Sequence, residues 1–72
     1  MAIIKGIGVL KPYSKTVAIP KPVPTACLPE LIELPEVYRE NIIAVRNSKV
    51  LSLDELVDDN DEILVFIAVM GG

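Results

Sequence analysis

Proline placement restricts the fold of this chain more than any other feature. All six prolines lie between positions 12 and 35, and three of them fall within residues 20–24. Proline fixes φ and lacks a backbone N–H, so it is excluded from central strands and from helix interiors. We therefore expect a stiff, extended connection at residues 20–24, with a polyproline II peptide ligand as the alternative. Regular structure is expected toward the two ends.

Four segments are expected to be β-strands, because they are rich in apolar and β-branched residues and are bounded by turn residues. They lie at residues 2–10, 15–19, 41–45 and 49–51. A turn over residues 11–14 makes the first two a hairpin, and Asn47 and Ser48 form the turn between the last two. A chain of 72 residues rarely divides, so a single domain is expected over residues 1–72.

One amphipathic helix is expected to begin after Thr25, which would cap it by accepting hydrogen bonds from the amides that follow. Leu28, Leu31 and Ile32 have the spacing of a helical apolar face. Pro35 should end this helix, because proline cannot continue a helix interior. A short second helical turn is expected after it.

Cysteine and histidine usage excludes several kinds of site. Cys27 is the only cysteine and the chain has no histidine, so neither an internal disulfide nor a Cys/His metal site is expected. Without a nearby base or second thiol, Cys27 is expected to be a small buried hydrophobe. The acidic run at residues 58–61 lacks the ligand spacing of a calcium loop, and Asn60 is instead expected in the left-handed conformation of a tight turn. A helical turn is expected before it, over residues 53–56.

Charge is divided unevenly along the chain, whose net charge is −3. Residues 1–29 carry four lysines and no acid, whereas residues 30–62 carry ten acids and three bases. The lysines are isolated and lack interleaved aromatic residues, so nucleic-acid binding is not expected. The acidic half is either solvated surface or a face that attracts a basic partner.

The most apolar segment is the run at residues 63–70, in which every side chain is hydrophobic. It is far shorter than the roughly 20 residues that cross a membrane as a helix. The N-terminus also lacks a signal-peptide pattern, so a cytoplasmic protein without membrane attachment is expected. As a strand, the run places its side chains alternately on two faces, one of which carries Leu64, Phe66, Ala68 and Met70. One helix covers only one face, so loops or a docked partner must cover the other.

The sequence ends in Gly71 and Gly72. Glycine has no side chain, so such a terminus fits a narrow channel of another protein as an extended strand, with a frayed tail as the alternative. Because carboxylate oxygen is a poor leaving group, the terminus would first be adenylated with ATP. Attack by a thiol, persulfide or amine then gives a thioester, thiocarboxylate or amide. No residue is a convincing general base, so we expect no catalytic residue in this chain and assign the catalysis to its partners.

The C-terminal half resembles the ubiquitin-like sulfur carriers of the MoaD/ThiS family. Residues 59–63, Asp-Asn-Asp-Glu-Ile, are similar to the family's Asp-Gly-Asp-x-Val turn into the last strand, at the family's distance from the terminal glycines. Asn47 and residues 50–54, Val-Leu-Ser-Leu-Asp, are similar to the preceding strand and loop of MoaD. Asn60 stands where the family usually has glycine, and residues 67–68 replace prolines that are frequent in MoaD.

This resemblance implies an α+β fold of the β-grasp (ubiquitin-like) type. It implies a mixed four- to five-stranded sheet with one main helix across one face, and a flexible C-terminal Gly-Gly tail. It further implies that Gly72 is adenylated and converted to a thiocarboxylate, with Gly71 as its flexible neighbour. By the same resemblance, Phe66, Ala68 and Met70 contact partners.

The implied partners are a ubiquitin-activating-like adenylyltransferase that uses ATP, a sulfurtransferase or persulfide donor, and a biosynthetic synthase subunit. The chain itself is expected to bind no cofactor. The implied pathway is cofactor biosynthesis, of the molybdopterin type in preference to thiamine thiazole. The alternatives are a ubiquitin-like modifier conjugated to lysines through Gly72 and a β-grasp interaction module whose glycines are idle.

Overall fold

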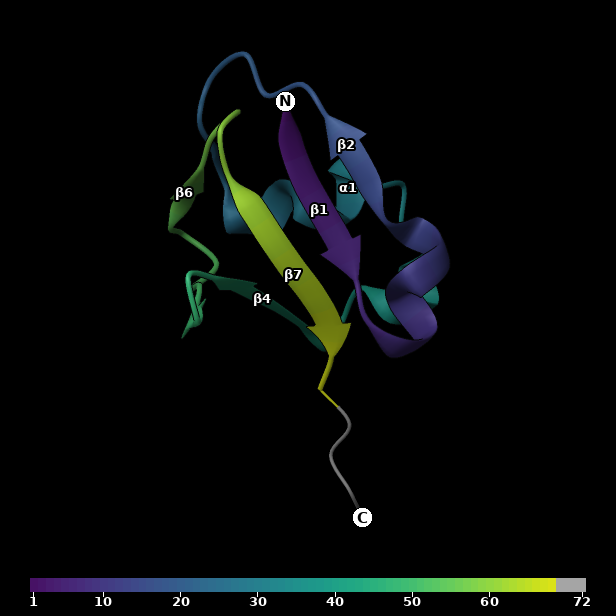
Figure 1. Ribbon diagram of the computed structural model, residues 1–72. Coiled ribbons are helices and arrows are strands. Elements are labelled where there is room, and N and C mark those ends of the chain that lie inside the picture. The colour runs from purple at the N-terminus through teal and green to yellow at the C-terminus, as the bar shows by residue number, and fades with distance from the viewer. Residues whose placement is uncertain (69–72) are drawn as a thin grey trace.

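The structure, a computed structural model, describes residues 1–68 as a mixed five-stranded sheet with one short α-helix on one face (Figure 1). The strands of this sheet are β1 (Ala2–Gly6), β2 (Lys15–Val17), β4 (Ile42–Arg46), β5 (Lys49–Val50) and β7 (Glu62–Ile67). The helical elements are η1 (Gly8–Tyr13), η2 (Thr25–Cys27), α1 (Leu28–Leu31) and η3 (Glu36–Tyr38), of which all but α1 are 3-10 turns. The expected α+β class and mixed sheet are confirmed.

Strand β7 lies at the centre of the sheet, whose order is β2-β1-β7-β4-β5. It runs parallel to β1, with Ile4 opposite Ile63, while the other neighbouring strands are antiparallel. In Figure 1 the chain between β2 and β4 passes behind the sheet and carries α1 there. A strand that is apolar on both faces suits this central position, because pairing along both edges satisfies its backbone groups.

The prolines at residues 20–24 have the predicted effect in part. The chain bends at residues 20 and 21 and is extended at the end of the segment, where β3 (Val23–Pro24) pairs antiparallel with β6 (Leu56–Val57). This ladder has only these two strands and stands apart from the five-stranded sheet. Proline is tolerated here because both strands are short and lie at the edge of the fold.

The first hairpin pairs as predicted, with Ile3 opposite Thr16, but the predicted strand over residues 2–10 is too long. Strand β1 ends at Gly6. The 3-10 turn η1 then occupies most of the remaining predicted strand and of the predicted turn over residues 11–14. A Cβ at Gly6 would lie 1.9 Å from the Leu10 carbonyl oxygen, so the chain turns back closely onto this glycine. The turn brings Leu10 fully into the core, which explains why the strand stops.

The helix is shorter than predicted, because α1 spans only four residues after the 3-10 turn η2. The prediction that Thr25 caps it is wrong. The Thr25 hydroxyl donates to the Glu55 carbonyl at 2.8 Å, and the Thr25 N–H donates to that same oxygen at 2.8 Å. Thr25 is buried, and it joins the helical layer to the loop before β6 instead of capping.

A Schellman motif ends α1 before Pro35 is reached. The Leu34 N–H donates to the Pro29 carbonyl at 2.9 Å, and the Glu33 N–H donates to the Glu30 carbonyl at 3.1 Å. Glu33 takes the left-handed position of this motif, with φ of 54°. The predicted helical turn after Pro35 is present as η3.

Two turn predictions differ in outcome. Asn47 and Ser48 form the turn between β4 and β5 as predicted, with φ of 53° and 65°. Asn60 is not left-handed, so that prediction is wrong. Instead the Asp58 carboxylate accepts the Asn60 N–H at 2.9 Å, which closes the turn with ordinary backbone angles.

The predicted helical turn over residues 53–56 is also wrong. Leu56 belongs to β6, and only a single hydrogen-bonded turn precedes it, in which the Glu55 N–H donates to the Ser52 carbonyl at 3.1 Å. Burial decides this outcome, because an extended β6 places Val57 entirely in the core.

The core lies between the sheet and the helical layer. Its buried hydrophobic residues are Ala2, Ile4, Leu10, Val17, Ile19, Leu28, Ile32, Leu34, Ala44, Leu51, Val57, Ile63 and Val65. Cys27 is only half-buried, whereas the sequence predicted a buried hydrophobe, so its burial is less than predicted. Its neighbour Leu28 takes the buried position instead, with 1% of its surface exposed. Within residues 1–68 no helix has the length and apolarity needed to cross a membrane.

Candidate functional site

The end of β7 is the part of the predicted site that lies within the described residues. Ile67 lies opposite Ile42 on β4, and the Ala68 N–H donates to the Asn41 carbonyl at 2.8 Å. This hydrogen bond extends the antiparallel ladder one residue past the end of β7. Met70, Gly71 and Gly72, three of the residues predicted to form the site, lie outside the described residues.

The two faces of β7 differ as the alternation predicts. Ile63 and Val65 point into the core and expose 0% and 1% of their surface. On the other face, Leu64 is 37% exposed and Phe66 is half-buried. Since α1 covers one side of the sheet, the side that carries Leu64 and Phe66 is the uncovered one, which faces the viewer in Figure 1.

The uncovered side of the sheet carries several neighbouring apolar side chains. We name it the open sheet face, and its apolar members are Ile3, Ile43, Val45, Val50, Leu64 and Phe66. Cross-strand pairs bring them together: Phe66 lies opposite Ile43, and Leu64 opposite Val45. Directly opposed side chains on one face of a sheet are in contact distance. The structure thus joins Phe66 to neighbours that the sequence did not single out, while Ala68 lies half-buried at the end of the same strand.

One ion pair lies on the open sheet face. Lys5 Nζ is 3.1 Å from Glu62 Oε1, and both side chains are more than half exposed. Lys5 also lies opposite Leu64, beside the apolar surface. Exposed pairs of this kind contribute about 0–1 kcal/mol, so the pair leaves the apolar character of the face unchanged.

The turn that leads into β7 is held by part-buried and exposed polar contacts. Arg46 Nη1 lies 2.8 Å from Asp61 Oδ2 and donates to the Leu56 carbonyl at 3.0 Å. The same Asp61 oxygen accepts the Asp58 N–H at 2.8 Å. Asp61 belongs to the turn that the sequence singled out, whereas Arg46 was missed, because nothing in the sequence connects an arginine to an acid 15 residues later.

Asp59 fixes a second loop to the same turn. Its Oδ1 accepts the Ile19 N–H at 2.8 Å, and its Oδ2 lies 3.2 Å from the amino group of Met1. The Ile19 N–H, followed by the amino group of Met1, holds the pKa of Asp59 below its ordinary value of 3.8. The carboxylate form of Asp59 therefore helps to position the chain that enters residues 20–24.

The arrangement places exposed and half-buried apolar side chains on the strand that leads toward the C-terminal glycines. In residues 1–68, no group of three or more His, Cys, Asp or Glu side chains lies close enough together to hold a metal ion. What the described residues provide is thus an apolar face, a central strand paired along both edges, and a hydrogen-bonded turn at its start. No protein-family model matches this chain, and no curated protein matches it at a significant level.

Proposed function

We propose that this protein is a cytoplasmic sulfur carrier with a β-grasp fold, which acts as a substrate of partner enzymes and not as an enzyme. Gly72 receives an adenylate from ATP, becomes a thiocarboxylate and gives its sulfur to a biosynthetic enzyme. Cofactor synthesis of the molybdopterin type is preferred to thiamine thiazole synthesis, because Asp61 follows Asn47 by 14 positions, a separation that resembles MoaD more than the longer loop of ThiS.

The observation that supports this proposal most is the position of β7. It is the central strand, it pairs parallel with β1, and only four residues lie between its last residue, Ile67, and Gly72. The strand order and the one-sided helical layer are compatible with a β-grasp fold. In such a carrier, a partner that holds the open sheet face also has the C-terminal residues within reach.

The chemistry at Gly72 follows from the carboxylate alone. Its oxygen attacks the α-phosphorus of ATP and releases pyrophosphate, and the resulting acyl adenylate has AMP as a good leaving group. A persulfide sulfur displaces AMP, and reduction of the acyl disulfide by a thiol leaves the thiocarboxylate. Gly71 and Gly72 carry no side chain beside the reacting carbon, so an enzyme channel admits them as an extended strand.

The enzymes supply every catalytic group in this scheme. An adenylyltransferase related to ubiquitin-activating enzymes binds ATP, a sulfurtransferase or other persulfide donor brings the sulfur, and a synthase subunit accepts it. The open sheet face, with Phe66 at its centre, is the surface that these partners share. Sharing one surface makes their complexes with the carrier mutually exclusive, so the carrier passes from one to the next.

Intact-protein mass spectrometry tests the proposal. The full chain, expressed in cells that hold its activating system, is expected to gain the mass of one sulfur-for-oxygen exchange, located at Gly72 by fragmentation. A variant lacking Gly72 should gain nothing, whereas Val37→Asp, at an exposed position off the sheet, should gain it normally. Adducts linked to lysines would instead identify a protein modifier. If the C-terminus stays unmodified and deletion of Gly72 does not affect the pathway, the remaining alternative is a β-grasp interaction module.

A further inference from the structure

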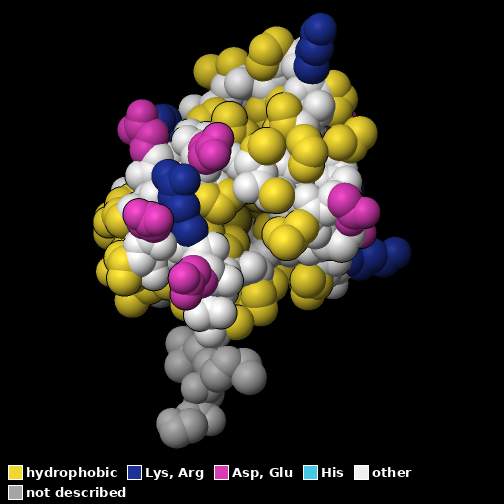
Figure 2. Space-filling view, turned by 180° about the vertical axis from the view of Figure 1, so that it is seen from behind, with side chains coloured by type: hydrophobic (Ala, Val, Ile, Leu, Met, Phe, Trp, Pro, Cys, Tyr) yellow, Lys and Arg dark blue, Asp and Glu magenta, His cyan; other side chains and the backbone are white. Residues whose placement is uncertain are grey.

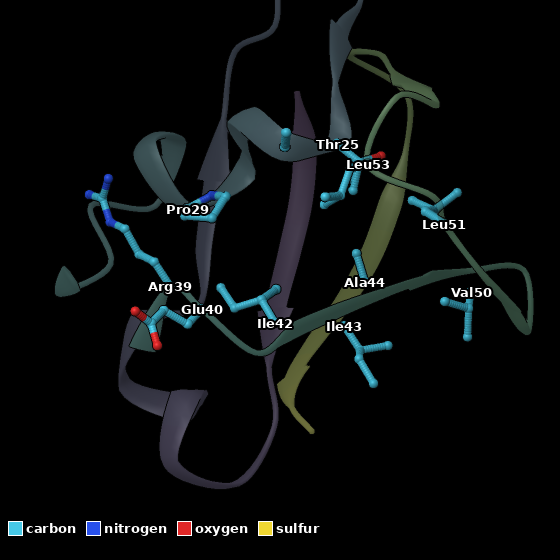
Figure 3. Close-up of a pocket in the computed structure, with 11 residues that line it drawn as sticks. Thr25, Pro29, Arg39, Glu40, Ile42, Ile43, Ala44, Val50, Leu51 and Leu53 are labelled. Atoms are coloured by element: carbon cyan, nitrogen blue, oxygen red, sulfur yellow. The ribbon is translucent and has the colours of Figure 1, made fainter. Parts of the chain in front are cut away.

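A hollow of about 370 Å³ lies on the helix side of the sheet at the edge of β4, and its lining also includes Ile43 and Val50 of the open sheet face. Ile42 and Ala44 of β4 face Pro29 of α1 across it, and Leu53 closes one side (Figure 3). The hollow exists because α1 has only four residues and leaves β4 partly uncovered. Figure 2 views this side of the molecule and shows hydrophobic side chains gathered around the hollowed surface.

The outer edge of β4 is open beside the hollow. Strand β5 pairs with the last two residues of β4, and the Leu51 N–H donates to the Ala44 carbonyl at 2.8 Å. On the inner edge, the Ala68 N–H donates to the Asn41 carbonyl. Hydrogen bonding alternates between edges along an antiparallel strand, so Ile42 directs its N–H and C=O toward the outer edge, beyond the end of β5. An extended chain fits in line with β5 at this position.

Acidic side chains lie at both ends of the hollow. Glu40 lines one end, and Asp54 and Glu55 follow directly after Leu53 at the other. The Ser52 hydroxyl is 2.9 Å from Asp54 Oδ1 and 3.2 Å from Glu55 Oε1, which holds both carboxylates in one short loop. Figure 2 shows acidic side chains on either side of the hollow. The electrostatic field here attracts a basic ligand.

Arg39 also lines the hollow, next to Glu40. Its Nε donates to the Leu34 carbonyl at 2.7 Å. Figure 3 shows its guanidinium pointing away from Ile42 and Ala44. The hydrogen bond to Leu34 thus holds the guanidinium against the helical layer, turned away from the apolar floor of the hollow.

We propose that this hollow binds an extended segment of a partner protein, in which one aliphatic side chain has a lysine or arginine two residues before it and two residues after it. Residues two apart in a strand share a face, so the aliphatic side chain enters the hollow while the basic ones meet Glu40 at one end and Asp54 and Glu55 at the other. Main-chain hydrogen bonds to Ile42 add affinity, and the hollow with its acidic ends selects the sequence.

Nuclear magnetic resonance on the isotopically labelled full chain tests this proposal with a blocked pentapeptide, Lys-Thr-Leu-Thr-Lys. The amide signals of Ile42, Ala44 and Leu53 are expected to shift on titration, whereas those of Ile3 and Leu64 on the open sheet face should not. Two control peptides replace the lysines by glutamate or the leucine by serine. Each is expected to bind about tenfold more weakly or worse, since each removes one complementary contact.

Two variants of the protein sharpen the result. Ala26→Leu fills the hollow from an exposed position and should abolish binding, while Ala18→Leu, the same change at an exposed position outside the hollow, should not. Glu40→Lys should weaken binding of the lysine peptide and strengthen binding of the glutamate peptide. The proposal is overturned if the lysine peptide does not bind, if the lysine and glutamate peptides bind equally well, or if the signals that shift belong to the open sheet face. It is also overturned if the signals shift with protein concentration in the absence of peptide, because the hollow would then bind a second copy of this chain.

Discussion

The Arg46 guanidinium lies 2.8 Å from the Asp61 carboxylate and so joins the last residue of β4 to the residue before β7. Their side chains expose only 26% and 17% of their surface, so water screens this pair less than the exposed pair of Lys5 and Glu62. Arg46 also satisfies the Leu56 carbonyl, and Asp61 satisfies the Asp58 N–H. This pair therefore fixes where the central strand begins.

Removing the Arg46 charge is expected to lower the free energy of unfolding. Arg46→Met keeps most of the aliphatic stem but leaves Asp61 half-buried without its partner, at a cost of about 2 kcal/mol. Urea denaturation measures the loss. Lys5→Met, which breaks an exposed pair, should cost about 0.5 kcal/mol or less. Equal losses of unfolding free energy in the two variants would show that the lower exposure of the Arg46 pair does not increase its contribution to stability.

The turn at Asn47 and Ser48 offers a stabilising change. Both residues have positive φ, which glycine adopts without the steric cost that a Cβ brings. Ser48→Gly is expected to raise the free energy of unfolding by about 0.5–1 kcal/mol. Ser52→Gly, at a position without positive φ, should lower it instead. Thermal and urea denaturation of both variants check the opposite signs.

Gly6 and Gly8 are predicted to differ sharply when each is replaced by alanine. At Gly6 the added Cβ meets the Leu10 carbonyl at 1.9 Å, so η1 must move and Leu10 loses packing, at a cost of about 3 kcal/mol. At Gly8 the Cβ meets nothing within 4 Å, and only the strain of φ +64° remains, at about 1 kcal/mol. Comparable losses at both positions, measured by denaturation, would argue against the close approach at Gly6.

Asp59 predicts a specific pH dependence of stability. Its pKa in the folded protein is lowered from 3.8, chiefly by the Ile19 N–H, so the carboxylate stabilises the fold fully above that value. This contribution is lost as the pH falls through the lowered pKa. The stability difference between the natural chain and Asp59→Asn should therefore be largest at neutral pH and shrink below pH 3.8. A difference that stays constant across the acid range would contradict this role.

Leu64 tests the open sheet face as the partner surface. Leu64→Asp places a charge among Val45, Phe66 and their neighbours, and is expected to weaken binding to the activating enzyme by at least about tenfold, because apolar contacts at the centre of an interface carry most of its affinity. Val37→Asp, at an exposed site away from this face, should bind normally. Affinity is measured with the purified activating enzyme, and unchanged binding of Leu64→Asp would exclude this face.

The sequence predicted those elements whose structure depends on local patterns. Alternation predicted the two faces of β7, and proline chemistry predicted the extended segment that ends in Val23 and Pro24. The turn at Asn47 and Ser48 was predicted for the same reason, because its residue types suit their backbone angles. Short-range chemistry decides each of these features, so the sequence displays it directly.

The remaining features depend on contacts between distant residues. Thr25 was expected to cap a helix, but Glu55, thirty residues away, accepts its hydroxyl hydrogen. The first strand stops at Gly6 because Leu10 must reach the core, and β6 replaces a helical turn because Val57 must do the same. The partner of Asp61 was likewise invisible, since only the folded sheet brings Arg46 to it. Tertiary packing overrides local preference in all four cases.

The parallel pairing of β1 with β7 also governs when the fold forms. Ile4 and Ile63 are neighbours in the sheet but 59 residues apart in the chain. Contacts between such distant residues slow folding, because a long loop must close before they are gained. During synthesis, the centre of the sheet stays incomplete until β7 has left the ribosome. A translation product that is interrupted before β7 therefore lacks the central strand, and its β1 and β4 have no strand between them to join them into one sheet.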